Sequence, residues 1–149
     1  MENKNDIILV EILTPQEWRT LARDAHLICF GEERDPLMDR IDFALINSKG
    51  GDPLNYCTVR ELDSESVYWQ YGGAFPNSKG TGTSYFSYER NAKWCFDRGY
   101  KRVTTYVENT NIAMLKIALK VGFRVIGTRT FNNCIMLELL LEGEWKTKK

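Results

Sequence analysis

The segment from Ile112 to Val121 constrains the fold most, because it has helix-forming composition and is apolar on nearly every side. Only Lys116 and Lys120 interrupt it, one turn apart, and Gly122 marks its end. A helix of this kind is expected to be largely buried, which requires other elements packed around it. The chain is therefore expected to build a layered domain.

Other segments are typical of strands and helices in a defined order. Apolar runs rich in β-branched or aromatic residues predict strands over residues 7–13, 43–47, 55–61, 66–75, 102–108, 123–130 and 134–141. Helical spacing predicts a helix over residues 83–98. Another helix is expected after a capping box at Thr14 and Glu17, with Gly31 at its end, and a short helix is expected after the polar loop of residues 32–36. Asn132 and Asn133 are expected to join the last two strands.

The order of these elements predicts an α/β (α+β) fold, with one domain over residues 1–149. A mixed, mostly antiparallel sheet is expected to carry helices on both of its faces. The chain has 149 residues with twenty basic and twenty acidic side chains, so a general affinity for nucleic acid or for an anionic membrane is not expected. The polar start lacks the apolar core of a signal peptide, and a cytoplasmic location is the expectation.

Cysteine and histidine usage argues against a metal site. The four cysteines are Cys29, Cys57, Cys95 and Cys134. No pair has metal-ligand spacing and each lies in an apolar run, so buried free thiols are expected rather than disulfides. His26 is the single histidine and cannot form a histidine-based metal site alone.

The loop from Phe75 to Thr83 joins an expected strand directly to an expected helix. Gly80 and Gly82 have no Cβ, so their backbone can approach a ligand closely. The first N–H groups of the helix lack internal partners and carry the positive end of its dipole. Together with Lys79 they favour a site for a phosphate or pyrophosphate.

Two common phosphate motifs do not fit this loop. A nucleotide P-loop needs the lysine after the glycine, whereas Lys79 precedes Gly80. A dinucleotide fingerprint needs a third glycine where Tyr85 stands. The remaining readings are a site for another phosphate ligand and a simple glycine turn before a helix.

The segment from Asn109 to Phe123 has an asparagine, an apolar helix, a lysine and then Gly-Phe. It resembles a signature of the GNAT superfamily of acyl-CoA-dependent N-acyltransferases. Upstream, residues 77–82 resemble the Gln/Arg-x-x-Gly-x-Gly/Ala motif of the same superfamily. The resemblance covers residues 66–141 well, and the earlier part only in the order of its elements.

The resemblance implies a site for acetyl-CoA. It implies that the strand before the loop splays away from its neighbour and that a pantetheine arm lies in the opening. Residues along the arm would be Tyr71, Gly72, Gly73, Ala74 and Phe75. Amides of Asn77, Ser78, Lys79, Gly80, Thr81, Gly82 and Thr83 would hold the pyrophosphate. Asn111 matches an asparagine that contacts the donor, and by residue type it is also a helix cap.

The implied reaction is direct attack by a neutral amine on the thioester. Backbone N–H groups near Gly73 are candidates for stabilising the oxyanion, and Glu33 and Glu108 are candidate bases. The superfamily often has a tyrosine acid where this chain has Ala118, and Tyr106 is a candidate surrogate. Asn77 replaces the usual Gln or Arg, which should matter little because backbone amides do most of the binding.

These features predict an N-acetyltransferase that uses acetyl-CoA and no metal, with a small amine, a peptide or a protein amine as acceptor. The alternative is a degenerate relative that binds coenzyme A as a sensor or interaction module. The sequence does not identify the acceptor, and it leaves homodimer formation open.

Overall fold

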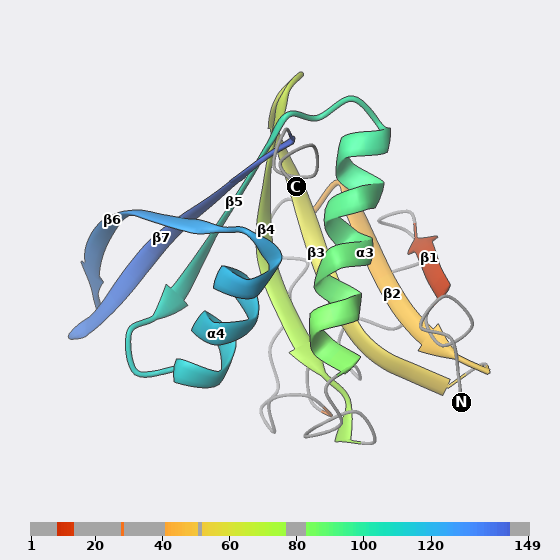
Figure 1. Cartoon of the computed structure of the whole chain (residues 1–149), viewed down its shortest axis with the longest axis horizontal. Helices are drawn as coiled ribbons and strands as arrows, with labels where there is room; N and C mark the ends of the chain where they lie inside the picture. Colours follow the sequence, from red (N-terminus) through yellow and green to blue (C-terminus); the bar gives the residue numbers. More distant parts are fainter. Residues whose placement is uncertain (1–8, 14–27, 29–40, 51, 77–82, 144–149) are drawn as a thin grey trace.

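The computed structural model describes residues 9–13, 28, 41–50, 52–76 and 83–143. Its elements are β1 (Leu9–Leu13), β2 (Phe43–Lys49), β3 (Asp52–Asp63), β4 (Ser66–Ala74), α3 (Thr83–Asp97), β5 (Arg102–Glu108), α4 (Ile112–Val121), β6 (Arg124–Phe131) and β7 (Cys134–Glu142) (Figure 1). Every strand expected from the sequence is present, with ends that shift by a few residues.

The seven strands form one sheet in the order β1-β2-β3-β4-β5-β7-β6. Neighbours are antiparallel throughout except β4 and β5, which run parallel. The mixed, mostly antiparallel sheet is therefore confirmed. The turn between β6 and β7 is the expected one, because Asn132 and Asn133 have φ of 50° and 63°. Two successive left-handed residues suit a tight hairpin, and asparagine tolerates that conformation.

The core lies between the sheet and the two described helices. Fully buried side chains of the strands, such as Val67, Val103 and Leu139, share one cluster with Ala92 of α3 and Val121 of α4. Both helices therefore cover the same face of the sheet, and Figure 1 shows α3 in front of β3, with α4 to its left beyond β4. The helices expected between residues 14 and 40 fall outside the described residues.

Helix α4 is less buried than its composition predicts. Ala118 and Val121 are its buried residues, whereas Ile112 and Leu119 are 54% and 52% exposed. The prediction of a largely buried helix is therefore wrong. One side of α4 packs on the sheet and on α3, whereas no described residue covers Ile112 and Leu119 on its outer side, so the apolar composition exceeds what this packing requires.

The ends of α4 are those expected from its sequence. The side chain of Asn111 accepts a hydrogen bond from the N–H of Met114 at 3.3 Å, which caps the first turn. At the other end Gly122 has a φ of 122°, and its N–H donates to the carbonyls of Ala118 and Leu119. A positive φ at this position favours glycine, which explains why the helix stops there.

Candidate active site

The site begins where β4 and β5 separate. Pairing between them covers three residue pairs, from Ser66–Arg102 to Tyr68–Thr104. One further contact follows, in which the Thr105 hydroxyl donates to the carbonyl of Trp69 at 3.2 Å. Beyond it β4 stays with β3 while β5 stays with β7, and Figure 1 shows the two strands diverging. The splayed central strands implied by the resemblance are present.

A bulge in β4 lies at this point of separation. Val59 pairs with Trp69 and Thr58 pairs with Tyr71, so Gln70 is an extra residue. A bulge bends its strand and leaves the extra residue outside the regular ladder. The side-chain Oε1 of Gln70 is buried and has no hydrogen-bond partner in the part of the chain that the structure describes. The bulge thus directs the second half of β4 away from β5.

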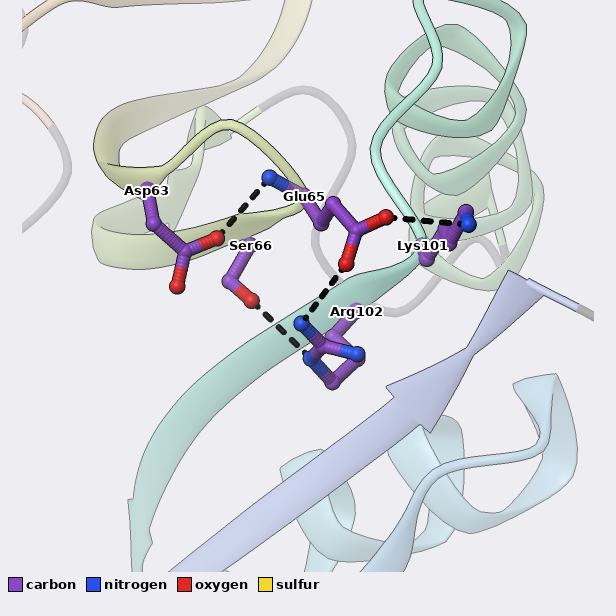
Figure 2. Close-up of polar contacts among 5 residues, drawn as sticks. All are labelled: Asp63, Glu65, Ser66, Lys101 and Arg102. Atoms are coloured by element: carbon purple, nitrogen blue, oxygen red, sulfur yellow. Dashed lines mark hydrogen bonds and ion pairs between the residues drawn. The ribbon is translucent and has the colours of Figure 1, made fainter.

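Charged side chains link the β3–β4 turn to the start of β5, at the end where β4 and β5 still pair (Figure 2). The Arg102 guanidinium donates to the Ser66 hydroxyl at 3.0 Å and lies 3.4 Å from the Glu65 carboxylate. Lys101 contacts the same carboxylate at 2.9 Å and, by its hydrogen bond and charge, lowers the pKa of Glu65. The backbone N–H of Glu65 donates to Asp63 at 2.8 Å and lowers the pKa of that carboxyl. These contacts hold the start of β5 against the β3–β4 turn.

A cavity of about 450 Å³ lies in the opening. Gly72, Gly73 and Ala74 of β4 form one wall, and residues 105–108 of β5 form the other. Side chains from both faces of the sheet reach the same cavity, because the two strands no longer touch there. Its boundary also includes Asn111 at the start of α4. Glycine at two successive positions of β4 leaves this wall without bulky side chains.

Six of the residues singled out in the sequence line this cavity: Gly72, Gly73, Ala74, Tyr106, Glu108 and Asn111. Phe75 is not in its lining; its N–H donates to the carbonyl of Leu54 at 2.8 Å and its ring meets that of Tyr56. Tyr71 pairs with Thr58 in the β3–β4 ladder. Thr83 begins α3, and Glu33 and residues 77–82 lie outside the described residues.

Tyr106 and Glu108 share one face of β5, as strand alternation predicts. The Tyr106 ring meets the Tyr68 ring at 5.7 Å, and the Arg129 guanidinium lies 5.2 Å from its centre. Glu108 accepts a hydrogen bond from the Cys134 thiol, which together with its charge raises the pKa of that thiol. Cys134 is half-buried, so the expectation of a buried thiol is wrong here, whereas Cys57 and Cys95 are buried as expected.

Helix α3 supplies a residue that the sequence analysis did not select. Tyr88 lines the cavity, its ring meets the Trp69 ring edge-on at 5.4 Å, and its hydroxyl lies 3.6 Å from Sδ of Met114. Burial, followed by the nearby Cys57, raises the pKa of Tyr88 well above its ordinary value. Helical periodicity places Tyr88 on the apolar stripe of α3, so the pattern indicated a core residue. Only the position of α3 over the opening reveals the cavity contact.

Three buried asparagines connect α3 to the sheet beside the cavity. The side-chain nitrogen of Asn47 donates to Oδ1 of Asn55 at 3.2 Å and to Oδ1 of Asn91 at 2.9 Å. Asn47 is 0% exposed, and its own Oδ1 has no hydrogen-bond partner among the described residues. Asn55 and Asn91 line the cavity. The cluster thus holds α3 at a fixed position above the β2–β3 pair.

Two features are absent from the described residues. No helix in this part of the chain has the length and apolarity needed to cross a bilayer. Among the same residues, no three histidine, cysteine or acidic side chains lie close enough together to hold a metal ion.

Comparison with solved structures relates this architecture to known proteins. A spermidine/spermine N-acetyltransferase from Vibrio cholerae superposes with a TM-score of 0.77 at 10% identity, covering 97% of this chain and 98% of the other. The IAA acetyltransferase from Bacillus cereus gives 0.73 at 14% identity, with 91% and 99% coverage. A GNAT family acetyltransferase from Elizabethkingia anophelis with acetyl-CoA bound gives 0.72 at 15% identity, with 92% and 99% coverage.

The chain has the GNAT fold. No protein-family model matches it, and no curated protein matches it in sequence. The sequence identities to these three structures are 10 to 15%.

Proposed function

We propose that the protein is an N-acetyltransferase that transfers the acetyl group of acetyl-CoA to a primary amine. The opening between β4 and β5 carries this proposal, because it combines an unpaired strand edge with a cavity reached from both faces of the sheet. One face can admit the acyl donor and the other the amine. The acetyltransferase neighbours, one of which has acetyl-CoA bound, support acetyl transfer.

The donor would lie along the β5-facing edge of β4. A pantetheine arm contains amide groups, and an extended chain with amides can add to an unpaired strand edge. Tyr71, Gly72, Gly73, Ala74 and Phe75 would lie along it. The pyrophosphate would bind at the start of α3, where the amides of residues 77–83 and the helix dipole favour an anion. Asn111, at the cavity boundary, would contact the donor in addition to capping α4.

In the proposed reaction the amine nitrogen attacks the thioester carbonyl, and the C–S bond then breaks with its electron pair passing to sulfur. A backbone N–H near Gly73 would stabilise the oxyanion that forms between these steps. Glu108 or Glu33 would remove the proton that the attacking nitrogen loses, directly or through water. Tyr106, on the same face as Glu108, is a candidate proton donor.

The acceptor is proposed to be a small-molecule amine. The spermidine/spermine N-acetyltransferase neighbours favour this class over a protein amine. Glu108 places one carboxylate at the cavity, where it would attract a cationic amine before deprotonation.

A second candidate function is a coenzyme A-binding sensor without turnover. The observation that favours it is Ala118, which is 0% exposed and presents only a methyl group to the core at the position of the expected tyrosine acid. In this reading the opening binds the donor but does not complete the transfer.

Binding and thiol release together test these proposals. Calorimetric titration with acetyl-CoA should show binding, and a ligand at 100 times its Kd should add about 2.7 kcal/mol to the unfolding free energy. Gly73→Val should abolish binding by filling the opening. Gly127→Ala is the matched control, because its Cβ would make only an ordinary contact, 3.5 Å from Glu138.

Each outcome has a distinct meaning. Absence of binding at millimolar acetyl-CoA would refute the donor assignment and both candidate functions. Binding with free-thiol release in the presence of a panel of monoamines and polyamines supports the transferase. Binding without release from any amine would support the sensor instead.

A further inference from the structure

The hydroxyl of Tyr88 is a half-buried donor with a weak acceptor. Its one hydrogen-bond partner among the described residues is the thioether sulfur of Met114, at 3.6 Å. A thioether accepts hydrogen bonds poorly, so this contact satisfies the hydroxyl only in part. The ring is fixed against Trp69, which is itself 3% exposed. The hydroxyl is therefore held at the cavity with capacity to donate to a stronger acceptor.

Tyr88 lies at the narrow end of the opening. Trp69, against which its ring packs, lies one residue beyond the paired stretch of β4, where its carbonyl accepts a hydrogen bond from the Thr105 hydroxyl. A donor whose pyrophosphate lies at the loop after β4 would extend its arm back along β4 toward this narrow end. The sulfur, at the far end of the arm, would then lie near Trp69 and beneath α3.

We propose that Tyr88 is a catalytic residue that donates its hydroxyl hydrogen bond to the sulfur of the acyl donor as the C–S bond breaks. This inference rests on the proposed function. When the tetrahedral intermediate collapses, the C–S electron pair passes to sulfur, and the O–H of Tyr88 stabilises the resulting thiolate without transferring its proton. The proton released by the amine leaves separately, through the base on the other face.

The surroundings of Tyr88 suit this role. Burial raises the pKa of Tyr88, so the phenol keeps its proton and remains a donor throughout the neutral and mildly alkaline range. A hydrogen bond to a charged acceptor is stronger than one to a neutral thioether, so a thiolate would displace Met114 as the partner. Tyr106 lies on the opposite face of the sheet, packed against Tyr68 and Arg129, where it would meet the amine side of the cleft.

The test measures the thiol pKa of bound coenzyme A, which needs no acceptor. Ultraviolet absorbance of the thiolate is titrated for coenzyme A bound to the wild type and to Tyr88→Phe, with the coenzyme-free protein subtracted. Loss of one hydrogen bond to a charged group should raise the thiol pKa by about 1 to 2 pH units in the variant. Equal thiol pKa values in the two proteins would overturn the inference while leaving the proposed function intact.

Tyr85→Phe is the matched control. Tyr85 lies on the same helix, but its hydroxyl donates to Glu89 at 3.0 Å and it does not line the cavity. This variant should leave the bound thiol pKa at the wild-type value, and a rise equal to that of Tyr88→Phe would refute a specific role for Tyr88. Failure of coenzyme A to bind the wild type would refute the proposed function as well.

A second variant keeps the inference testable if Tyr88→Phe does not fold. Met114→Leu removes the thioether that competes for the hydroxyl and retains an apolar side chain of similar size. It should lower the bound thiol pKa or leave it unchanged. A rise in Met114→Leu would overturn the inference, because removing a competitor cannot weaken donation to the thiolate.

Discussion

Replacing Asn47 with leucine should lower the free energy of unfolding by only about 1 kcal/mol, although Asn47 is fully buried. Leucine removes the two hydrogen bonds to Asn55 and Asn91, each of which contributes about 1 kcal/mol net. It also removes the unpartnered Oδ1 of Asn47, whose burial already costs about 1 kcal/mol. The two acceptor oxygens left behind belong to Asn55 and Asn91, which are 6% and 1% exposed but line the cavity, so a water in the cavity is expected to replace the lost donor.

Aspartate at the same position should cost at least about 4 kcal/mol at pH 7. Its carboxylate places acceptor oxygens against the acceptor oxygens of Asn55 and Asn91, at the present separations of 3.2 and 2.9 Å. Both hydrogen bonds are lost, and a charge is buried without a partner. Burial should therefore raise the folded-state pKa of the introduced carboxyl above its unfolded value of about 3.9.

The sign of the pH dependence follows from that raised pKa. The aspartate variant should be most stable, relative to the leucine variant, below about pH 4, where the carboxyl is protonated in both states. In its protonated form the carboxyl can also donate one hydrogen bond. Its relative stability should fall as the pH rises through the folded-state pKa.

Urea unfolding at several pH values measures both effects, with the midpoint and the m-value compared among wild type, Asn47→Leu and Asn47→Asp. The leucine variant is the volume-matched control for loss of the amide. A leucine variant less stable than the aspartate variant at pH 7 would refute the reasoning, since it would mean that packing at this position outweighs the polarity of the cluster.

Three further outcomes are expected. Ala118→Tyr should lower the unfolding free energy by about 1 to 3 kcal/mol, because the site is fully buried, and a denaturant midpoint equal to wild type would contradict this. Glu108→Gln should speed the reaction of Cys134 with a thiol reagent at pH 8 by a few-fold, since the carboxylate raises the pKa of that thiol, and an unchanged rate would disprove the contact. Burial raises the pKa of Cys95 and of Tyr100 to about 12 each. The free energy of unfolding should therefore be highest below about pH 9 and fall as the pH rises toward 12. A melting temperature that stays constant up to pH 11 would count against this.

The strands and the ends of α4 could be predicted from the sequence because each depends on local patterns. Period-two runs predict strands, Asn111 caps a helix by its own side chain, and the pair Asn132–Asn133 accepts the left-handed backbone of a hairpin. Burial of α4 was predicted wrongly, because composition reports which residues are apolar and not which sides of a helix find partners. Ile112 and Leu119 are exposed for that reason.

The geometry of the candidate site depends on tertiary structure that no local pattern encodes. The bulge at Gln70 follows from the register between β3 and β4, which is set by the whole sheet. Periodicity marked Tyr88 as an apolar-stripe residue of α3, and only the packing of α3 above the opening turns that stripe toward a cavity. Sequence motifs could therefore suggest strand β4 and the loop that follows it, but not the contribution of Tyr88 from helix α3.

The parallel pairing between β4 and β5 is short, so it forms only a narrow connection between two lobes of the molecule. One lobe contains β1 to β4 with α3, and the other contains β5 to β7 with α4. Among the described residues, the connections between the lobes include three backbone residue pairs, the Thr105–Trp69 hydrogen bond and the contacts of Lys101 and Arg102 in Figure 2. The ring contact between Tyr68 and Tyr106 and the packing of α3 on α4 also join them. A molecule bound in the opening would contact both lobes and restrict their motion relative to each other. In the absence of a bound molecule, the backbone amides of β4 and β5 beyond their paired residues should exchange with solvent quickly. When a molecule is bound, the two lobes should unfold as one cooperative unit.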